Sequence, residues 1–169
     1  MTRLRVGVVS DTHAPRFWKA CPPRVREVLD GSDVILHAGD VCLPGVLDEL
    51  ARIAPVHAVL GNNDGPEVAA WGGGVPETLE LDLAGLPVAM IHDSGQKTGR
   101  LARMRRRFPD ARLVVFGHSH IPWDDAADDG FRVFNPGSPT DKRRQPHGTV
   151  GLLEVEDGEL LTARIVPVT

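Results

Sequence analysis

The chain of 169 residues has few cysteines, few aromatic side chains and no surplus of positive charge. Cys21 and Cys42 are its only thiols, far fewer than a disulfide-stabilised secreted scaffold carries, so we expect both to be reduced and the protein to be cytoplasmic. With 19 Lys and Arg against 23 Asp and Glu, the net charge is -4, which makes bulk nucleic acid an unlikely partner class. Five Phe and three Trp also leave little for a base-stacking surface.

Long apolar runs are also missing. No stretch of about 18 consecutive apolar residues occurs, so we expect no membrane span. The apolar run at residues 6–9 is much shorter than a signal-peptide core and leads directly into Asp11, so no export signal is predicted. The length and the 41% hydrophobic content fit a single domain over residues 1–169 with its own core.

Short apolar runs typical of buried strands alternate with longer helical patterns along the chain. This alternation predicts an α/β protein with a mainly parallel sheet. The strands predicted in this way are residues 4–10, 34–38, 56–60, 88–92 and 112–116. Polar residues follow each of them, and ligands bind at the carboxyl ends of the strands in such sheets. We therefore expect these polar residues to meet in one crevice.

Helices and two antiparallel strand pairs complete the predicted elements. Helices are predicted at residues 22–29, 43–53 and 98–108. The third carries five arginines around an apolar stripe, which we interpret as a solvated face. The strand pairs are 78–83 with 86–91 and 150–155 with 160–166, and they indicate a second sheet.

Four short polar motifs and a lone histidine carry the candidate site. They are Asp11-Thr12-His13, Gly39-Asp40, Gly61-Asn62-Asn63-Asp64, His92 and Gly117-His118-Ser119-His120. Residues two apart in an extended strand point to the same side, which predicts Asp11 with His13, and His118 with His120, as chelating pairs. The glycines that precede Asp40, Asn62 and His118 would permit tight turns at the strand ends.

Seven of these side chains form a candidate set of metal ligands that mixes carboxylate, amide and imidazole groups. They are Asp11, His13, Asp40, Asn62, His92, His118 and His120. Seven ligands are too many for one ion, whereas two ions that share a carboxylate use such a set and leave positions for water and substrate. Oxygen and nitrogen donors without thiolate favour transition metals over Ca or Mg. We expect two divalent ions, and the donors leave the choice among Mn, Ni, Fe, Co and Zn open.

The order D-x-H, G-D, G-N-x-D, lone His and G-H-x-H resembles the pattern of calcineurin-like metallophosphoesterases, of the small bacterial and archaeal phosphodiesterase type. The match runs from Asp11 to His120. It extends to Asn135-Pro136-Gly137-Ser138, which resembles a turn common in this subgroup. The resemblance implies the metallophosphoesterase fold, a four-layer α/β/β/α sandwich of two mixed sheets flanked by helices.

The resemblance also implies a role for each residue. The first metal would have four ligands, Asp11, His13, Asp40 and His120. The second would share Asp40 as a bridge and add Asn62, His92 and His118. Asp64 would orient a neighbour by a hydrogen bond, and it is expected to act in catalysis with Asp40, Asn62 and His118. Water held between two cations is acidified, so a bridging hydroxide could attack phosphorus in line with the leaving oxygen.

Two departures from the family pattern bear on the predicted substrate and site. Many family phosphatases have a histidine after the Asn of G-N-x-D as a candidate acid, whereas this chain has Asn63, which cannot supply a proton near neutral pH. The resemblance is to members that tend toward phosphodiesters, so we predict a small phosphodiester substrate. His92 is followed by Asp93 where the family commonly has glycine beside this histidine. Asp93 is therefore an alternative to His92 as the group close to the metals, or it would form a hydrogen bond to a ligand.

Two alternative functions stay open. One is a phosphomonoesterase or protein phosphatase activity. A nuclease activity ranks below it, because the sequence shows no excess of Lys and Arg that would bind a polymeric substrate. The other is a non-catalytic scaffold, since the same fold occurs in a retromer subunit whose binding surfaces carry its role. A scaffold has no need of all seven ligands, so their presence argues for catalysis. The identity of the diester and the oligomeric state are not predicted.

Other residues that could be taken for ligands are expected to be structural. His37 is predicted to be hydrogen bonded in the core or beside a ligand, and His57 and His147 to be structural or exposed. Cys42 is predicted to be a buried free cysteine.

Overall fold

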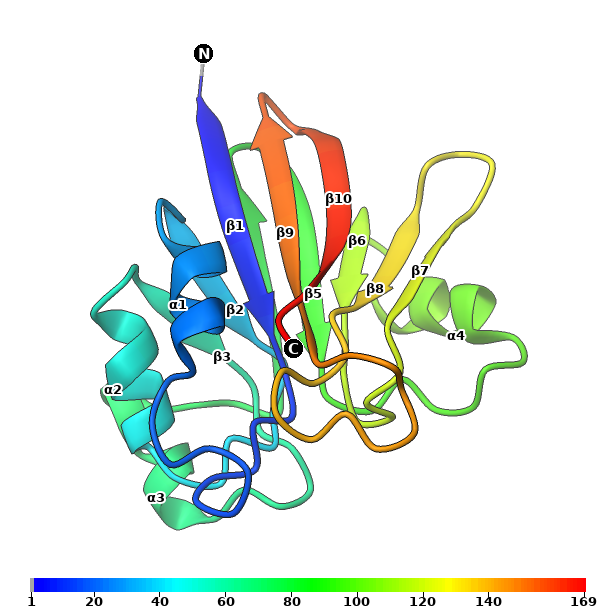
Figure 1. Cartoon of the computed structure of the whole chain (residues 1–169). Helices are drawn as coiled ribbons and strands as arrows, with labels where there is room; N and C mark the ends of the chain where they lie inside the picture. Colours follow the sequence, from blue (N-terminus) through cyan, green and yellow to red (C-terminus); the bar gives the residue numbers. More distant parts are fainter. Residues whose placement is uncertain (1) are drawn as a thin grey trace.

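Two mixed sheets packed against each other form the centre of the protein in the computed structural model, which describes residues 2–169 (Figure 1). The first sheet has the order β10-β9-β1-β2-β3. Its strands are β1 (Arg3–Val9), β2 (Val34–His37), β3 (Val56–Ala58), β9 (Thr149–Glu156) and β10 (Glu159–Pro167). In this sheet β1, β2 and β3 run parallel, β9 pairs antiparallel with β1, and the edge strand β10 pairs antiparallel with β9.

The second sheet has the order β4-β5-β6-β8-β7. Its strands are β4 (Thr78–Leu83), β5 (Leu86–Ile91), β6 (Leu113–Val115), β7 (Trp123–Ala126) and β8 (Arg132–Asn135). The three inner strands β5, β6 and β8 run parallel, and each edge strand is antiparallel to its neighbour.

Helices cover the outer faces of both sheets, so the layers follow the order α/β/β/α. The helices are α1 (Pro23–Leu29), α2 (Gly45–Ala51), α3 (Pro66–Ala69) and α4 (Arg100–Arg107), with a short 3-10 helix at Trp71–Gly73. Figure 1 draws α1 and α2 on one side of the molecule and α4 on the other. The expected four-layer sandwich of two mixed sheets is confirmed.

Alternation along the strands assigns their side chains to three apolar cores. On β2, Ile35 packs with residues of α1 and α2, whereas its neighbour Leu36 lies between the sheets. On β6, Val114 packs with Met104 of α4, and its neighbour Val115 lies between the sheets. Strands β2 and β6 are therefore buried on both faces, which explains why these two segments are continuous apolar runs.

The five strands predicted for one mainly parallel sheet are divided between the two sheets, so their placement in one sheet is wrong. Three of the five predicted strands lie in the first sheet and two in the second, and the two strand pairs join different sheets. A strand that is apolar on both faces does not reveal which of two sheets contains it. Strand β7 escaped prediction because its Trp-Asp-Asp-Ala sequence is that of a polar edge strand. No helix in residues 2–169 is long and apolar enough to cross a membrane.

Candidate metal centre

The four motifs and His92 lie in the loops at the carboxyl ends of β1, β2, β3, β5 and β6. Five of these residues have left-handed backbone conformations: Asp11 (φ 57°), His13 (φ 47°), Asp40 (φ 56°), His118 (φ 73°) and His120 (φ 62°). A left-handed conformation costs a residue with a Cβ about 1–2 kcal/mol, so the surrounding structure must hold these loops in place. The extended geometry from which we predicted chelating pairs is therefore not present here.

Backbone hydrogen bonds bind the loops after β1 and β2 to each other. The N–H of Asp11 donates to the carbonyl of Gly39 at 2.9 Å, and the N–H of His13 donates to the carbonyl of Asp40 at 3.1 Å. These bonds place the carboxylates of Asp11 and Asp40 side by side.

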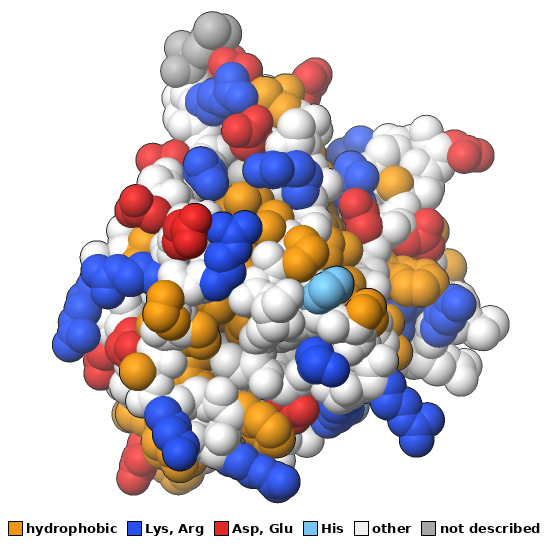
Figure 2. All heavy atoms as spheres, in the orientation of Figure 1, with side chains coloured by type: hydrophobic (Ala, Val, Ile, Leu, Met, Phe, Trp, Pro, Cys, Tyr) orange, Lys and Arg blue, Asp and Glu red, His pale blue; other side chains and the backbone are white. Residues whose placement is uncertain are grey.

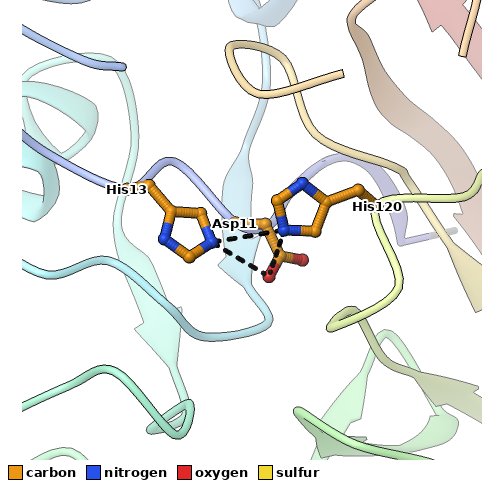
Figure 3. Close-up of side chains that lie close together, drawn as sticks. All are labelled: Asp11, His13 and His120. Atoms are coloured by element: carbon orange, nitrogen blue, oxygen red, sulfur yellow. Dashed lines mark hydrogen bonds and ion pairs between the residues drawn. The ribbon is translucent and has the colours of Figure 1, made fainter. Parts of the chain in front are cut away.

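One group of candidate ligands consists of Asp11, His13 and His120, whose side chains point toward one another in Figure 3. The Nε2 atoms of His13 and His120 lie 3.2 Å apart. The Oδ1 atom of Asp11 lies 3.7 Å from Nε2 of His13 and 3.5 Å from Nε2 of His120. Two donors that are each about 2.1 Å from one ion lie about 3–3.5 Å apart, so these separations suit a shared ion.

A second group consists of Asp11, Asp40 and His92. The Nε2 atom of His92 lies 3.3 Å from Oδ2 of Asp40 and 3.8 Å from Oδ1 of Asp11. The same Oδ2 atom of Asp40 lies 3.5 Å from Nε2 of His13. Asp40 belongs to the second group and therefore also lies beside the first.

Two buried atoms at the centre of these groups have no hydrogen-bond partner in residues 2–169, Oδ1 of Asp11 and Nε2 of His92. A buried polar atom without a partner costs about 1–3 kcal/mol. Cations between the two groups would satisfy both atoms, because a carboxylate oxygen and the Nε2 of a neutral imidazole each offer an electron pair. The residues present therefore fit divalent metal ions.

Asn62 and His118 lie at the rim of this cluster and contact each other. The Oδ1 atom of Asn62 is 3.2 Å from Nδ1 of His118, whose side chain is 45% exposed. The His118 ring stands edge-on to His92 with 5.2 Å between ring centres, and its backbone N–H donates to Oδ2 of Asp11. His120 is instead 1% exposed and turns toward His13. The structure does not bring His118 and His120 together as a chelating pair.

Glycines in the motifs allow close approach as well as tight turns. Gly39 has a φ of 100°, as expected for a turn. Gly61 and Gly117 do not have positive φ. A Cβ on Gly61 would overlap Oδ1 of Asp40, and one on Gly117 would lie 2.6 Å from Oδ2 of Asp11. These two positions need glycine because Asp40 packs against the backbone of Gly61, and Ser10 and Asp11 pack against that of Gly117.

Asn63 and Asp64 hold the Asp40 loop. Asn63 donates its backbone N–H to Oδ1 of Asp40 and its Nδ2 to Oδ2, both at 2.9 Å. Asp64 accepts backbone N–H groups from Asp40, Gly61 and Cys42 at 2.7–2.9 Å. Asp64 thus orients Asp40 by a hydrogen bond, and Asn63 contacts the carboxylate itself.

In the absence of metal, neighbouring charges shift the pKa values of several side chains in the cluster. The carboxylate of Asp11, followed by the Cys42 contact, raises the pKa of His13 to about 10. Burial alone would raise the pKa of Asp40, but His92 and Asn63 hold it well below its usual range. Burial would lower the pKa of His92, yet Asp40 and Asp11 raise it. A metal ion would therefore displace protons from the imidazoles when it binds.

A loop that we did not assign to the site supports two of its ligands. The Oγ of Ser138 donates to the carbonyl of Asp11 at 2.8 Å, and Thr140 donates to the carbonyl of Thr12 at 3.0 Å. The Nδ1 of His120 lies 2.6 Å from the carbonyl oxygen of Asp141. In the sequence, only the Asn-Pro-Gly-Ser turn indicates that this loop belongs to the site. No sequence motif points to Thr140 or Asp141.

The residues expected to be structural lie outside both groups. His37 is fully buried, lies 3.1 Å from Oγ1 of Thr12 and accepts the N–H of Gly39, as predicted. His57 is exposed. Cys42 is free but only half-buried, and its Sγ lies 3.8 Å from Nδ1 of His13.

The two mixed sheets and the carboxylate and imidazole groups at their strand ends are features of metallophosphoesterases. A family model described as the calcineurin-like phosphoesterase superfamily domain matches residues 4–158, and the chain belongs to this family. The family expected from the motifs is confirmed.

Relatives of this chain are found among archaeal proteins and solved structures. A probable metallophosphoesterase of Methanothermobacter thermautotrophicus is 33% identical over 165 residues, which cover 96% of this chain and 92% of that protein. Vps29 of Entamoeba histolytica in complex with Zn²⁺ has a TM-score of 0.77 at 24% identity, with 98% of this chain and 100% of that chain covered. A structure described as a novel archaeal phosphodiesterase has a TM-score of 0.73 at 22% identity, with 96% and 100% covered. At these identities the two structures show a shared fold.

Proposed function

We propose that this protein is a two-metal phosphodiesterase that hydrolyses small phosphodiesters. The observation that carries the proposal is the pair of ligand groups that share Asp11, with Asp40 in one group and beside the other, and with two buried donor atoms left unpartnered. Such an arrangement suits two neighbouring ions better than one.

Each residue has a role in this proposal. Asp11, His13 and His120 would hold one ion with Asp40, and Asp40 would bridge to a second ion held by His92, Asn62 and His118. Bound ions would supply an acidified water for in-line attack and neutralise charge on the phosphoryl oxygens. Asn62 and His118 line a cavity of about 360 Å³ beside His92, where part of the substrate would lie.

Asn63 supports the choice of a diester. Its backbone N–H and its Nδ2 both donate to the Asp40 carboxylate, and its amide is not acidic enough to protonate a leaving group near neutral pH. Its role would be to hold Asp40 in place. The fold similarity to an archaeal phosphodiesterase is consistent with this substrate class.

Mn is our first choice of metal, with Ni, Fe, Co or Zn as alternatives, because the donors are oxygen and nitrogen without thiolate. The similarity to a zinc-bound Vps29 supports a transition metal. We further propose that the chain acts as one domain in the cytoplasm, with Cys21 and Cys42 reduced; both are free in the structure.

A non-catalytic scaffold is the second candidate, and the similarity to Vps29 favours it. The unpartnered buried donors favour catalysis, because a scaffold has no need to keep costly unpaired atoms at one point.

One experiment separates these functions. Metal-depleted protein is reloaded separately with Mn, Ni, Co, Zn or Mg and assayed against bis(p-nitrophenyl) phosphate and p-nitrophenyl phosphate. We expect Mn-loaded protein to cleave the diester faster. Faster cleavage of the monoester would indicate a phosphomonoesterase, and metal binding without hydrolysis of either ester would indicate a scaffold.

A further inference from the structure

A second hollow, of about 240 Å³, flanks His120 on the side of the first ligand group. It is lined by Ser119, His120, Ile121 and the segment 142–145. We call it the basic pocket, because its lining includes three cationic side chains and no Asp or Glu: Lys142, Arg143 and Arg144. The hollow is thus positively charged in a chain whose net charge is -4.

The larger cavity beside His92 has the opposite balance of charge. It is lined by Arg107 together with Asp64, Glu77 and Asp93. Apart from the charge of bound metal ions, the side chains of the basic pocket therefore attract an anionic group of a substrate more strongly than those of the larger cavity do.

The three cations of the basic pocket are available to a ligand. Within residues 2–169, none of them forms an ion pair. The Nζ of Lys142 donates to the carbonyl of Gln145 at 3.1 Å, and the side chains of Arg143 and Arg144 are exposed. Figure 2 shows Lys and Arg side chains in the region where Figure 1 draws the loop between β8 and β9, and others elsewhere on the same face.

The loop that carries these cations is fastened to the candidate metal ligands. Ser138 and Thr140 donate to the carbonyls of Asp11 and Thr12, and Asp141 accepts from the His120 ring. The N–H of Gln145 then donates to the carbonyl of Lys142 at 2.9 Å and closes a turn with two arginines at its tip. The backbone that carries the cations is therefore held at a set position relative to the candidate metal centre.

We propose that the basic pocket receives a second phosphate group of the substrate, so that the preferred substrate is a small phosphodiester that carries a further phosphate. The proposal rests on the proposed function, in which the scissile phosphate lies at the metals. The two arginines would bind the second phosphate through paired N–H groups. Ile121, which is 46% exposed, would contact the organic part between the two phosphates. Water is added across one P–O bond of the diester, and the second phosphate leaves unchanged.

A matched pair of chromogenic diesters tests the proposal. The p-nitrophenyl ester of thymidine 5′-phosphate is compared with the same ester bearing a 3′-phosphate, using Mn-loaded protein. We expect kcat/KM to be about tenfold higher for the phosphorylated ester, the effect of two exposed ion pairs. The Arg143→Gln/Arg144→Gln double variant should bring the two values to about parity. Arg106→Gln removes an exposed cation of α4 outside the described cavities and should keep the preference.

Binding supplies a second readout. Thymidine 3′,5′-bisphosphate should bind about tenfold more tightly than thymidine 5′-phosphate in a calorimetric titration, and the double variant should lose this difference. Equal kcat/KM values for the two esters in the unmodified protein would overturn the inference and leave the proposed function standing. If neither ester is hydrolysed, the proposed function fails, and equal binding of the two nucleotides would then overturn the inference as well.

Discussion

The Gly61→Ala substitution tests whether Asp40 must stay where the structure places it. A Cβ at this position would lie 2.8 Å from Cγ of Asp40 and overlap its Oδ1 atom. Carbon atoms in contact normally lie about 3.5–4.0 Å apart, so the Asp40 carboxylate would have to move by about 1 Å. Metal sites tolerate changes of about 0.2 Å in ligand distance. A movement of this size would take Asp40 out of reach of any ion that it holds.

The expected loss affects both ions because Asp40 belongs to one ligand group and lies beside the other. Loss of a group that merely supports a ligand lowers metal affinity about 10–100-fold. Displacement of the bridging ligand itself should reach the upper end of this range, about 100-fold, for both ions. Hydrolysis of bis(p-nitrophenyl) phosphate should fall with the metal content.

Gly65→Ala is the matched control in the same loop. No heavy atom lies within 4 Å of a Cβ on Gly65, and its φ of -104° suits alanine. Both variants are purified, checked for folding by circular dichroism and titrated with Mn in a calorimeter. The reasoning is refuted if folded Gly61→Ala protein binds Mn as tightly as the Gly65→Ala control does.

Three further substitutions test separate parts of the site. His92→Ala should lower the metal content of Mn-loaded protein from two ions to one per chain by elemental analysis, and retention of two ions would count against its assignment to the second metal. Ser138→Ala removes the buried hydrogen bond to the Asp11 carbonyl and should lower the free energy of unfolding in urea by about 1–3 kcal/mol; an unchanged value would show that this bond does not hold the loop. Burial lowers the pKa of His37 to about 4, so the stability associated with its neutral form is complete above its unfolded pKa of about 6.5 and is lost as the pH falls toward 4. Between pH 6.5 and pH 4, the free energy of unfolding of the metal-free protein should therefore fall by up to about 3 kcal/mol more than that of the metal-free His37→Gln variant. If the two proteins lose the same free energy over this range, His37 is not held in its neutral form by burial.

Local patterns in the sequence predicted the strand ends at which the site is built. Asp11, Asp40 and His92 each follow a short apolar run, and such runs form strands whose carboxyl ends lie at one edge. The allocation of strands to two sheets was not predictable, because it depends on pairings between distant segments such as β1 with β9. Apolar residues on both faces suit either sheet equally well.

The geometry within the site was less predictable than its composition. Asp11 and His120 have left-handed backbone conformations, which are invisible in a pattern that assumes extended strands. The support of the His120 ring by the Asp141 carbonyl joins residues 21 positions apart, and a backbone acceptor leaves no mark in the sequence. The sequence shows that Asn63 stands where a proton-donating histidine is common, but only the structure shows its contact with Asp40.

The central claim is that two ions act together at the site that Asp11 and Asp40 share. The most direct measurement is a titration of metal-depleted protein with Mn in which hydrolysis of bis(p-nitrophenyl) phosphate is followed at each metal equivalent. We predict little activity at one equivalent per chain and a rise that is complete at two. Full activity at one equivalent, or none at two, would contradict the account.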